Sequence, residues 1–404
     1  MDTQRPFTIL CLASEFKGIP FILEAKRQGC RVILVTPEAF AGHPWPWESI
    51  DLHFQMPDLH TQPNITYAVS YLARGNAIDR IVALDDYDVA TAAALREHLR
   101  LPGLGESRVR HFRDKLAMRG AARRAGILAP EFTAVFNYDR LRDFMARVPP
   151  PWVLKPRFDA GAMGIRKLHD GERLWRTLDE LGDQQSYYLL EQFVPGDVFH
   201  VDSLWWADAP VFAIASQYGA PPLAITQGGG IFNTRTLARD AEPGRTLLAR
   251  NAELLRTLGL GQGVSHTEFI RAHADGRFYF LETAARVGGA NIDRMVKAAT
   301  DIELWGEAAR IVVADLRGEA YQLPPHRDEH AGLIICLARQ EYPDLSGYTD
   351  PEIVWRLDKP YHAGLLVASH SAARAAELLE QYNGRFAHDF LTHSPSRQQG
   401  RTTF

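Results

Sequence analysis

A regular alternation of strand-like and helix-like segments over the first 100 residues or so is the feature that most constrains the fold. Apolar runs such as "FTILCLAS" and "RVILVT" indicate buried strands, and helical segments such as "GIPFILEAKRQG" and "DYDVATAAALREHL" follow them. This order predicts a doubly wound parallel sheet. The first turn, "LASEFKGIP", lacks the GxGxxG fingerprint, so a nicotinamide cofactor is not favoured. Asp85, Asp86 and Asp88 follow a strand end, where such folds place ligands, although a helix N-cap cluster is the alternative.

The size and composition of the chain indicate a multidomain protein of the cytoplasm. Its 404 residues exceed what one core usually holds. The net charge is −4 with no basic run, so we expect neither a nucleic-acid partner nor a membrane surface. Cys11, Cys30 and Cys336 are isolated and odd in number, which fits a reducing compartment. The N-terminus lacks the basic start of a signal peptide, and no apolar run reaches the length of a membrane span.

A predicted hairpin, "SHTEFIRAHADGRFYFLETAARVGG", brings two acids together. Asp-Gly between apolar runs favours a hairpin, and a three-residue loop (274–276) places Glu268 directly across from Glu282. A two-residue loop would put Glu282 on the other face. The first register also places Ile270, Ala272, Phe278 and Phe280 on the carboxylate face, and Thr267, Phe269, Arg271, Tyr279 and Leu281 on the other. Facing carboxylates repel, so buried ones need a cation, for which Mg²⁺ with substrate phosphates is the natural candidate.

Three further motifs supply the parts of a nucleotide site. "LKPRFDAGAMGIRKL" puts Lys155 at the end of a strand, before a turn of small residues that lets backbone N–H groups approach phosphates. The chain has only seven lysines beside 38 arginines, which adds weight to Lys155 and to Lys115 in "RDKLAMR". In "LLEQFVPGD", Glu191 ends a strand before an extended linker, where its carboxylate could accept from the amine of adenine. Each motif has a plain structural alternative as an ordinary turn or exposed face.

These motifs, in this order, resemble the ATP-grasp superfamily, and within it the carboxylate–amine ligases of the L-amino-acid ligase type, with "HTE" followed by "ETAAR". The resemblance covers residues 7 to 315. It implies an α/β and α+β fold in which two α+β subdomains clamp ATP behind an N-terminal doubly wound sheet. The divisions that we expect are an N-terminal Rossmann-like domain (1–105), a linker helix and lid subdomain (106–195), a catalytic subdomain (196–317), a C-terminal α+β part (318–393) and a disordered tail (394–404).

The resemblance also implies roles for residues at matching positions. The residues that would contact ATP are Lys115, Lys155, Gly161, Ala162, Met163, Gly164, Glu191, Gln192, Phe193 and Val194. Glu268 and Glu282 would hold Mg²⁺ or Mn²⁺, and Arg286 would stabilise the phosphorylated intermediate. His266 shares the carboxylate face, with a packed core histidine as the alternative.

Two positions depart from the pattern of the superfamily. Ala284 stands where many members have a metal-binding asparagine, and Val198 where many have the acid that holds ribose. Asp197 or Asp202 could take the place of that acid. We read "TQGGGIFNTR" as a loop on the acceptor side, with Arg235 as a partner for phosphate or carboxylate, whereas Trp205 and Trp206 belong to the core.

The activity that the resemblance implies is an ADP-forming, ATP- and Mg²⁺-dependent ligase. It would join a carboxylate, such as an amino acid or small acid, to an amine through an acyl phosphate. Three alternatives stay open at this point: a carboxyphosphate-forming carboxylase, a phosphotransferase, and a non-catalytic ATP-binding protein. The partners would be small molecules, and a homodimer is compatible with the sequence.

Overall fold

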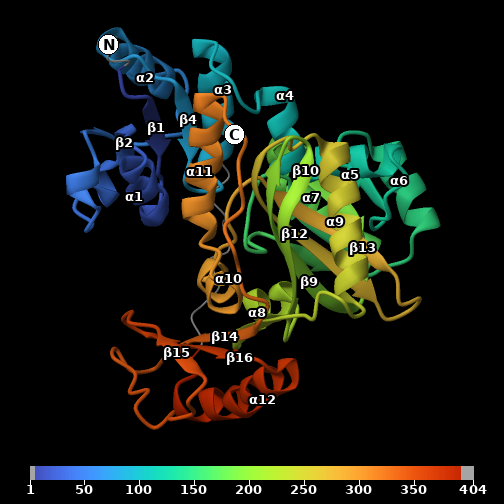
Figure 1. The fold of residues 1–404 in the computed structure, drawn as a ribbon. Coiled ribbons are helices and arrows are strands. Elements are labelled where there is room, and N and C mark those ends of the chain that lie inside the picture. Colours follow the sequence, from blue (N-terminus) through green and yellow to red (C-terminus); the bar gives the residue numbers. More distant parts are fainter. Residues whose placement is uncertain (1–4, 393–404) are drawn as a thin grey trace.

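The computed structural model describes residues 5–392, and the predicted tail falls outside them (Figure 1). The N-terminal unit is a four-stranded parallel sheet of order β3-β2-β1-β4, as the alternation predicts. Its strands are β1 (Thr8–Leu12), β2 (Arg31–Pro37), β3 (Leu52–Met56) and β4 (Arg80–Ala83), with helices α1 (Ile19–Arg27), α2 (Asn64–Gly75) and α3 (Asp88–Leu99). β1 is buried along its whole length, as expected for a central parallel strand.

A second sheet lies within the segment that is predicted to be the lid subdomain. It is antiparallel, of order β5-β8-β6-β7, and its strands are β5 (Phe132–Ala134), β6 (Trp152–Pro156), β7 (Arg166–Leu168) and β8 (Tyr188–Gln192). Helices α6 (Tyr138–Arg147) and α7 (Gly171–Leu181) share an apolar core with it. The short α4 (Glu106–Val109) and then α5 (Lys115–Arg124) lead into this unit. The Asp114 side chain caps α5 by accepting from the backbone N–H of Leu116.

The third sheet has eight strands in the order β13-β12-β9-β10-β11-β14-β16-β15. Their bounds are β9 (Gly196–Trp206), β10 (Ala209–Tyr218), β11 (Phe232–Thr236), β12 (Gly263–Ala272), β13 (Phe278–Ala284), β14 (His330–Leu337), β15 (Ile353–Arg356) and β16 (His362–Ser369). Helix α9 (Gly244–Leu258) packs on one face, whereas α10 (Ile292–Thr300) and α11 (Leu304–Arg317) separate the other face from the N-terminal unit (Figure 1). Trp205 is fully buried, as predicted.

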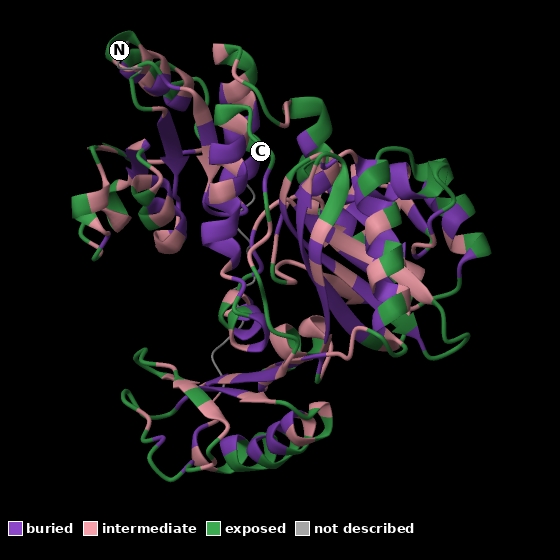
Figure 2. Ribbon diagram, viewed as in Figure 1, coloured by how far each residue is buried: buried purple, intermediate pink, exposed green. Residues whose placement is uncertain are grey.

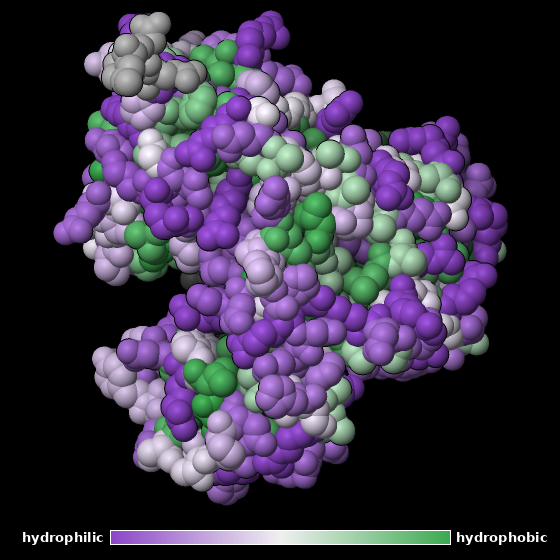
Figure 3. Space-filling view, viewed as in Figure 1, coloured by the Kyte–Doolittle hydropathy of each residue, from purple (hydrophilic) through white to green (hydrophobic). Residues whose placement is uncertain are grey.

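The C-terminal segment is built into this third sheet. Strands β14, β16 and β15 extend it through antiparallel pairing with β11, and α12 (Ala372–Asp389) covers them. The buried strands lie between helices with exposed outer faces (Figure 2), and the face seen in Figure 3 is mainly hydrophilic. Within residues 5–392, none of the helices is long and apolar enough to cross a membrane.

The hairpin of β12 and β13 has the predicted pairing at the acids but not at its tip. Glu268 lies opposite Glu282, after which the register shifts so that Phe269 pairs with Phe280. The N–H of Ala272 donates to the carbonyl of Arg277 at 3.0 Å, which leaves four residues, 273–276, in the loop. The bulge reverses the faces of the distal half of β13. The predicted faces were therefore wrong for four residues, because Phe278 and Phe280 pack with Phe269, while Tyr279 and Leu281 pack with Ile270.

Candidate active site

A small cavity gathers charged side chains from three parts of the chain. Asp86 follows β4, Lys115 begins α5, and Glu282 lies on β13, with Arg286 just after that strand. The other lining residues are Phe112, Arg113, Met118, Asp159, Ala160, His266, Thr283 and Ala284. Three of the residues predicted from the sequence, Lys115, Glu282 and Arg286, therefore meet at one place.

The two facing carboxylates have different partners. The Nζ of Lys115 lies 2.9 Å from Oε2 of Glu282. The hydroxyl of Tyr218 donates to Oε1 of Glu268 at 2.9 Å. The sequence predicted a cation beside these acids, with Mg²⁺ as the natural candidate, and in the structure the Lys115 ammonium supplies a positive charge there.

The second predicted lysine, Lys155, is also paired within the protein. Its Nζ lies 2.6 Å from Oε1 of Glu191, and Nε of Arg119 lies 2.8 Å from Oε2. The side chain of Glu191 is only 1% exposed. Burial raises the pKa of Glu191, but Arg119 and Lys155 outweigh it and lower the pKa overall. The predicted contact between this carboxylate and the amine of adenine does not fit, because the carboxylate points into the protein.

The glycine-containing turn adopts the left-handed backbone that its sequence favours. Gly161, Ala162 and Gly164 have φ values of +65°, +59° and +67°. A Cβ on Gly164 would lie 2.8 Å from Cγ of Pro156, so the close approach requires glycine. Met163 stands between Ala162 and Gly164 in this turn. The side chain of Gln227, in α8 (Pro222–Gly228), donates to the carbonyl of Ile165 at 3.0 Å, which holds the turn from the side of the large sheet.

Helix α5 holds the same turn from the other side. The Lys115 ammonium donates to the carbonyl of Asp159, and Arg113 donates to the carbonyl of Phe158. Among the contacts of the described residues, both carboxylate oxygens of Asp159 are buried and have no hydrogen-bond partner. Burial raises the pKa of Asp159. The phosphate-loop candidate is therefore tied to the residue that pairs with Glu282.

The predicted hinge and acceptor-side residues lie outside this cavity. The backbone N–H groups of Gln192 and Phe193 already donate to other carbonyls, and Val194 packs against the apolar core. Asp197 is largely exposed, with its Oδ1 3.4 Å from Nε2 of His273. Arg235 donates to the side chain of Gln217 at 2.9 Å. It belongs to β11, so the interpretation of its segment as a loop was wrong at that residue. The roles of these residues stay predictions.

Buried charges also hold Arg286. Its Nε lies 3.5 Å from Oδ1 of Asp86, and one terminal nitrogen donates to the carbonyl of Val287 at 2.9 Å. Arg113 pairs with the other oxygen of Asp86 at 2.6 Å. Burial raises the pKa of Asp86, but Arg113 and Arg286 outweigh it and keep the pKa low. Asp86, the acid that follows β4, thus lines the candidate site. This favours the interpretation that the acids after β4 lie at the ligand-binding edge of the parallel sheet.

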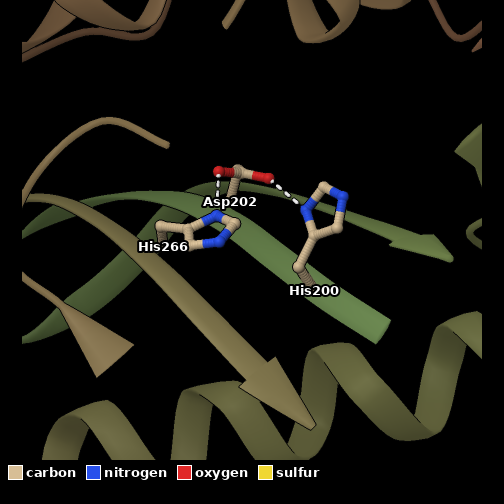
Figure 4. Close-up of side chains that lie close together, drawn as sticks. All are labelled: His200, Asp202 and His266. Carbon is tan, nitrogen blue, oxygen red and sulfur yellow. Dashed lines mark hydrogen bonds and ion pairs between the residues drawn. The ribbon is translucent and has the colours of Figure 1, made fainter. Parts of the chain in front are cut away.

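The sequence did not reveal a buried relay of His200, Asp202 and His266, which is drawn in Figure 4, and His266 also lines the cavity. Oδ1 of Asp202 lies 2.9 Å from Nδ1 of His266, and Oδ2 lies 2.7 Å from Nδ1 of His200. Nε2 of His200 in turn lies 2.8 Å from the hydroxyl of Thr234. Burial lowers the pKa of His266, but Asp202 and Glu268 outweigh it and raise the pKa to about 9. Asp202 is fully buried between the two rings, so it cannot hold ribose.

The same three side chains have ligand atoms within 4.8 Å of one another, the spacing of a metal cluster. Each ring nitrogen, however, points at its own carboxylate oxygen (Figure 4), which is the geometry of two hydrogen bonds. The only sequence signal for this relay was the alternation that puts His200 and Asp202 on one face of β9. Tyr218, Arg113 and Arg119 carried no signal beyond their residue type.

The donor set of the facing acids fits a divalent ion. Glu268 and Glu282 are direct cross-strand partners on one face, and both are oxygen donors of the kind that Mg²⁺ or Mn²⁺ prefers. The Lys115 ammonium beside Glu282 shows that this carboxylate can stabilise a positive charge. The alanine at position 284 contributes no ligand atom, so water and nucleotide oxygens would complete the coordination.

Comparisons with known proteins show what the chain resembles in sequence. No family model matches the chain. It is 27% identical over 244 residues to the L-arginine-specific L-amino acid ligase of Bacillus subtilis, covering 58% of each protein. It is 23% identical over 252 residues to the alanine–anticapsin ligase of Bacillus subtilis, covering 56% of this chain and 52% of that protein. The match thus spans about half the length of these curated relatives.

Solved structures resemble nearly the whole chain. The L-amino acid ligase from Bacillus licheniformis superposes with a TM-score of 0.75 and 18% identity, covering 97% of this chain and 100% of that one. The N5-carboxyaminoimidazole ribonucleotide synthetase from Thermotoga maritima gives a TM-score of 0.69 at 16% identity, covering 96% and 100%. The resemblance inferred from the motifs is confirmed: the chain has the ATP-grasp fold, and its sequence relatives include amino-acid ligases.

Proposed function

We propose that this protein is an ADP-forming ligase that uses ATP to join a carboxylate to an amine. The observation that carries the proposal is the convergence of Lys115, Glu282 and Arg286 at one cavity, with Glu268 directly across the β12–β13 hairpin from Glu282. Cations and acids of this kind suit a phosphoryl group in transfer. The likeness to amino-acid ligases supports an amino acid or small acid as one substrate.

Lys115 and Lys155 would bind the phosphates of ATP. Each is paired with a carboxylate in the structure, so the binding of ATP would exchange one partner for another. When Lys115 turns to a phosphate oxygen, Glu282 becomes free beside Glu268. These two acids would then hold Mg²⁺ or Mn²⁺, which supplies charge neutralisation of the phosphates.

The transfer itself would have two steps. A carboxylate oxygen of the acid substrate attacks the γ-phosphorus and ADP leaves, which gives an acyl phosphate. The amine nitrogen then attacks the acyl carbon, phosphate leaves, and the amine loses a proton. Arg286, which is held by Asp86, would stabilise the charge that builds on the transferring phosphoryl group. The turn at Gly161–Gly164 would exclude water from the acyl phosphate.

The wider expectations remain part of this proposal. The five divisions of the chain, a cytoplasmic location, small-molecule partners without nucleic acid or membrane, and a homodimer follow from the same interpretation. The N-terminal sheet would contribute to substrate binding through Asp86, because the ends of parallel strands form a common ligand edge.

A pairwise screen of amino acids and small acids tests the proposal through the release of ADP and phosphate. A ligase requires both an acid and an amine for full turnover. A carboxylase would require bicarbonate, a phosphotransferase would release ADP without an amine, and a non-catalytic protein would release none. Glu268→Gln should abolish the signal, whereas Glu253→Gln on the exposed face of α9 should leave it intact. Turnover with no amine, or equal turnover in Glu268→Gln, would contradict the proposal.

A further inference from the structure

The contacts of Glu268 described above reach one of its two carboxylate oxygens, Oε1. The Tyr218 hydroxyl donates to Oε1 at 2.9 Å, and Nε2 of His266 lies 3.7 Å from the same atom. The side chain is 16% exposed. Both neighbours lie against Oε1, and Glu282 is the cross-strand partner of Glu268.

The Tyr218 hydroxyl donates to Glu268 from a strand that is not adjacent to β12. Its strand, β10, is separated from β12 by β9, so the side chain reaches over that strand to Glu268. Its ring lies 4.7 Å from the ring of His200 and 5.7 Å from that of Phe232. A carboxylate oxygen only accepts, so the hydroxyl is the donor in its contact with Glu268.

The second neighbour, His266, is held just as firmly. Asp202 binds its Nδ1, and His200 and Thr234 continue the relay away from the site. A Cβ on Gly288 would lie 2.8 Å from Oδ1 of Asp202 and 3.0 Å from Nδ1 of His266, so glycine leaves the space for this pair. The ring of His266 therefore has little freedom to leave Glu268.

We propose that Tyr218 is a positioning residue for the divalent-ion site, and that the Asp202–His266 pair supports it. Through Oε1 it orients Glu268 so that Oε2 is ready to bind the ion, in the way that outer hydrogen bonds orient metal ligands. The inference rests on the proposed function in one respect, namely that Glu268 is a metal ligand. It concerns ion binding and is independent of which acid and amine are joined.

The test compares how much Mn²⁺ tightens the binding of a non-hydrolysable ATP analogue to the wild type and to Tyr218→Phe. Calorimetric titrations with Mn²⁺ and with EDTA give the two dissociation constants, and the electron paramagnetic resonance spectrum of the ternary complex reports the environment of Mn²⁺. The gain in affinity from Mn²⁺ should fall about 10- to 100-fold in Tyr218→Phe, with a changed spectrum. The affinity measured in EDTA should stay within about twofold of the wild type, since no nucleotide contact is removed.

Tyr321→Phe is the matched control. Its hydroxyl donates to Oε2 of the buried Glu307 at 2.7 Å, away from the site, so the same chemical change is made without reaching the ion. Asp202→Asn should also reduce the gain in affinity from Mn²⁺, by a smaller factor than Tyr218→Phe. If Tyr218→Phe does not fold, the result for Asp202→Asn is the test of the inference.

Two outcomes would overturn the inference. One is a Mn²⁺ gain in Tyr218→Phe within about twofold of that of the wild type and of Tyr321→Phe. The other is a wild type that shows no Mn²⁺ gain. A wild type that shows the gain but couples no acid to an amine would contradict only the proposed ligase activity.

Discussion

Replacing Glu282 by glutamine tests the ion pair at the centre of the candidate site. The change keeps the size of the side chain and removes the charge that faces the Lys115 ammonium at 2.9 Å. If repulsion between facing acids dominated, the metal-free variant would be more stable by about 0.2–1 kcal/mol. With Lys115 in place, the sign reverses, because a mostly buried ammonium loses its partner.

The magnitude follows from the exposure of the two side chains, 9% for Lys115 and 31% for Glu282. Breaking a fully buried pair costs about 3–5 kcal/mol, and an exposed pair contributes about 0.2–1 kcal/mol. Lys115 also keeps its hydrogen bond to the carbonyl of Asp159. We therefore expect Glu282→Gln to lower the free energy of unfolding of the metal-free protein by about 1–2 kcal/mol.

The assay is urea unfolding followed by tryptophan fluorescence, without metal or nucleotide. A double-mutant cycle with Lys115→Met isolates the pair, and we expect a favourable coupling of about 1 kcal/mol. A Glu282→Gln protein as stable as the wild type, or a coupling near zero, would refute the reasoning. With Mg²⁺ and ATP at about 100 times the dissociation constant, the wild type should gain about 2.7 kcal/mol and the variant much less.

Three further changes probe the rest of the site. Lys155→Met should weaken ATP binding about 10-fold in calorimetry while the protein stays folded, because Glu191 keeps Arg119 as its cation; an unchanged affinity would remove Lys155 from the nucleotide site. Arg286→Lys should lower kcat about 100-fold or more with little change in ATP affinity, and equal effects on both would make it a ground-state or structural residue. In the metal-free protein, the pKa of His266 near 9 exceeds the value of about 6.5 in an unfolded chain, so its stabilisation is complete below about pH 6.5 and is lost as the pH rises through 9. The free energy of unfolding should fall by on the order of 2–3 kcal/mol over that window, and a His266→Asn protein with the same slope would contradict this assignment.

The local pattern of the chain was enough to predict much of the secondary structure and the pairing of the two acids in the hairpin. Alternating apolar runs and helices predicted the parallel sheet of β1 to β4, because strands that alternate with helices along the chain usually form a parallel sheet covered by those helices. The Asp-Gly turn predicted that Glu268 and Glu282 are cross-strand neighbours, because pairing in a hairpin is set by residues close in sequence. The bulge beyond Glu268 was not predictable, since the core on either face of the hairpin decides where an extra residue is accommodated.

What the sequence by itself determined is the order of the elements, the ATP-grasp character and the identity of the facing acids. Only the tertiary structure decided which polar and charged side chains pair with one another. Lys115 pairs with Glu282, Lys155 turns to the buried Glu191, and Tyr218 reaches Glu268 from a strand that is not adjacent. Each of these contacts joins segments that are distant along the chain, and the energy of a buried charge depends on whatever surrounds it after folding. Residue spacing carries no information about those surroundings, because they are created when helices and strands that are distant along the chain come together in the fold.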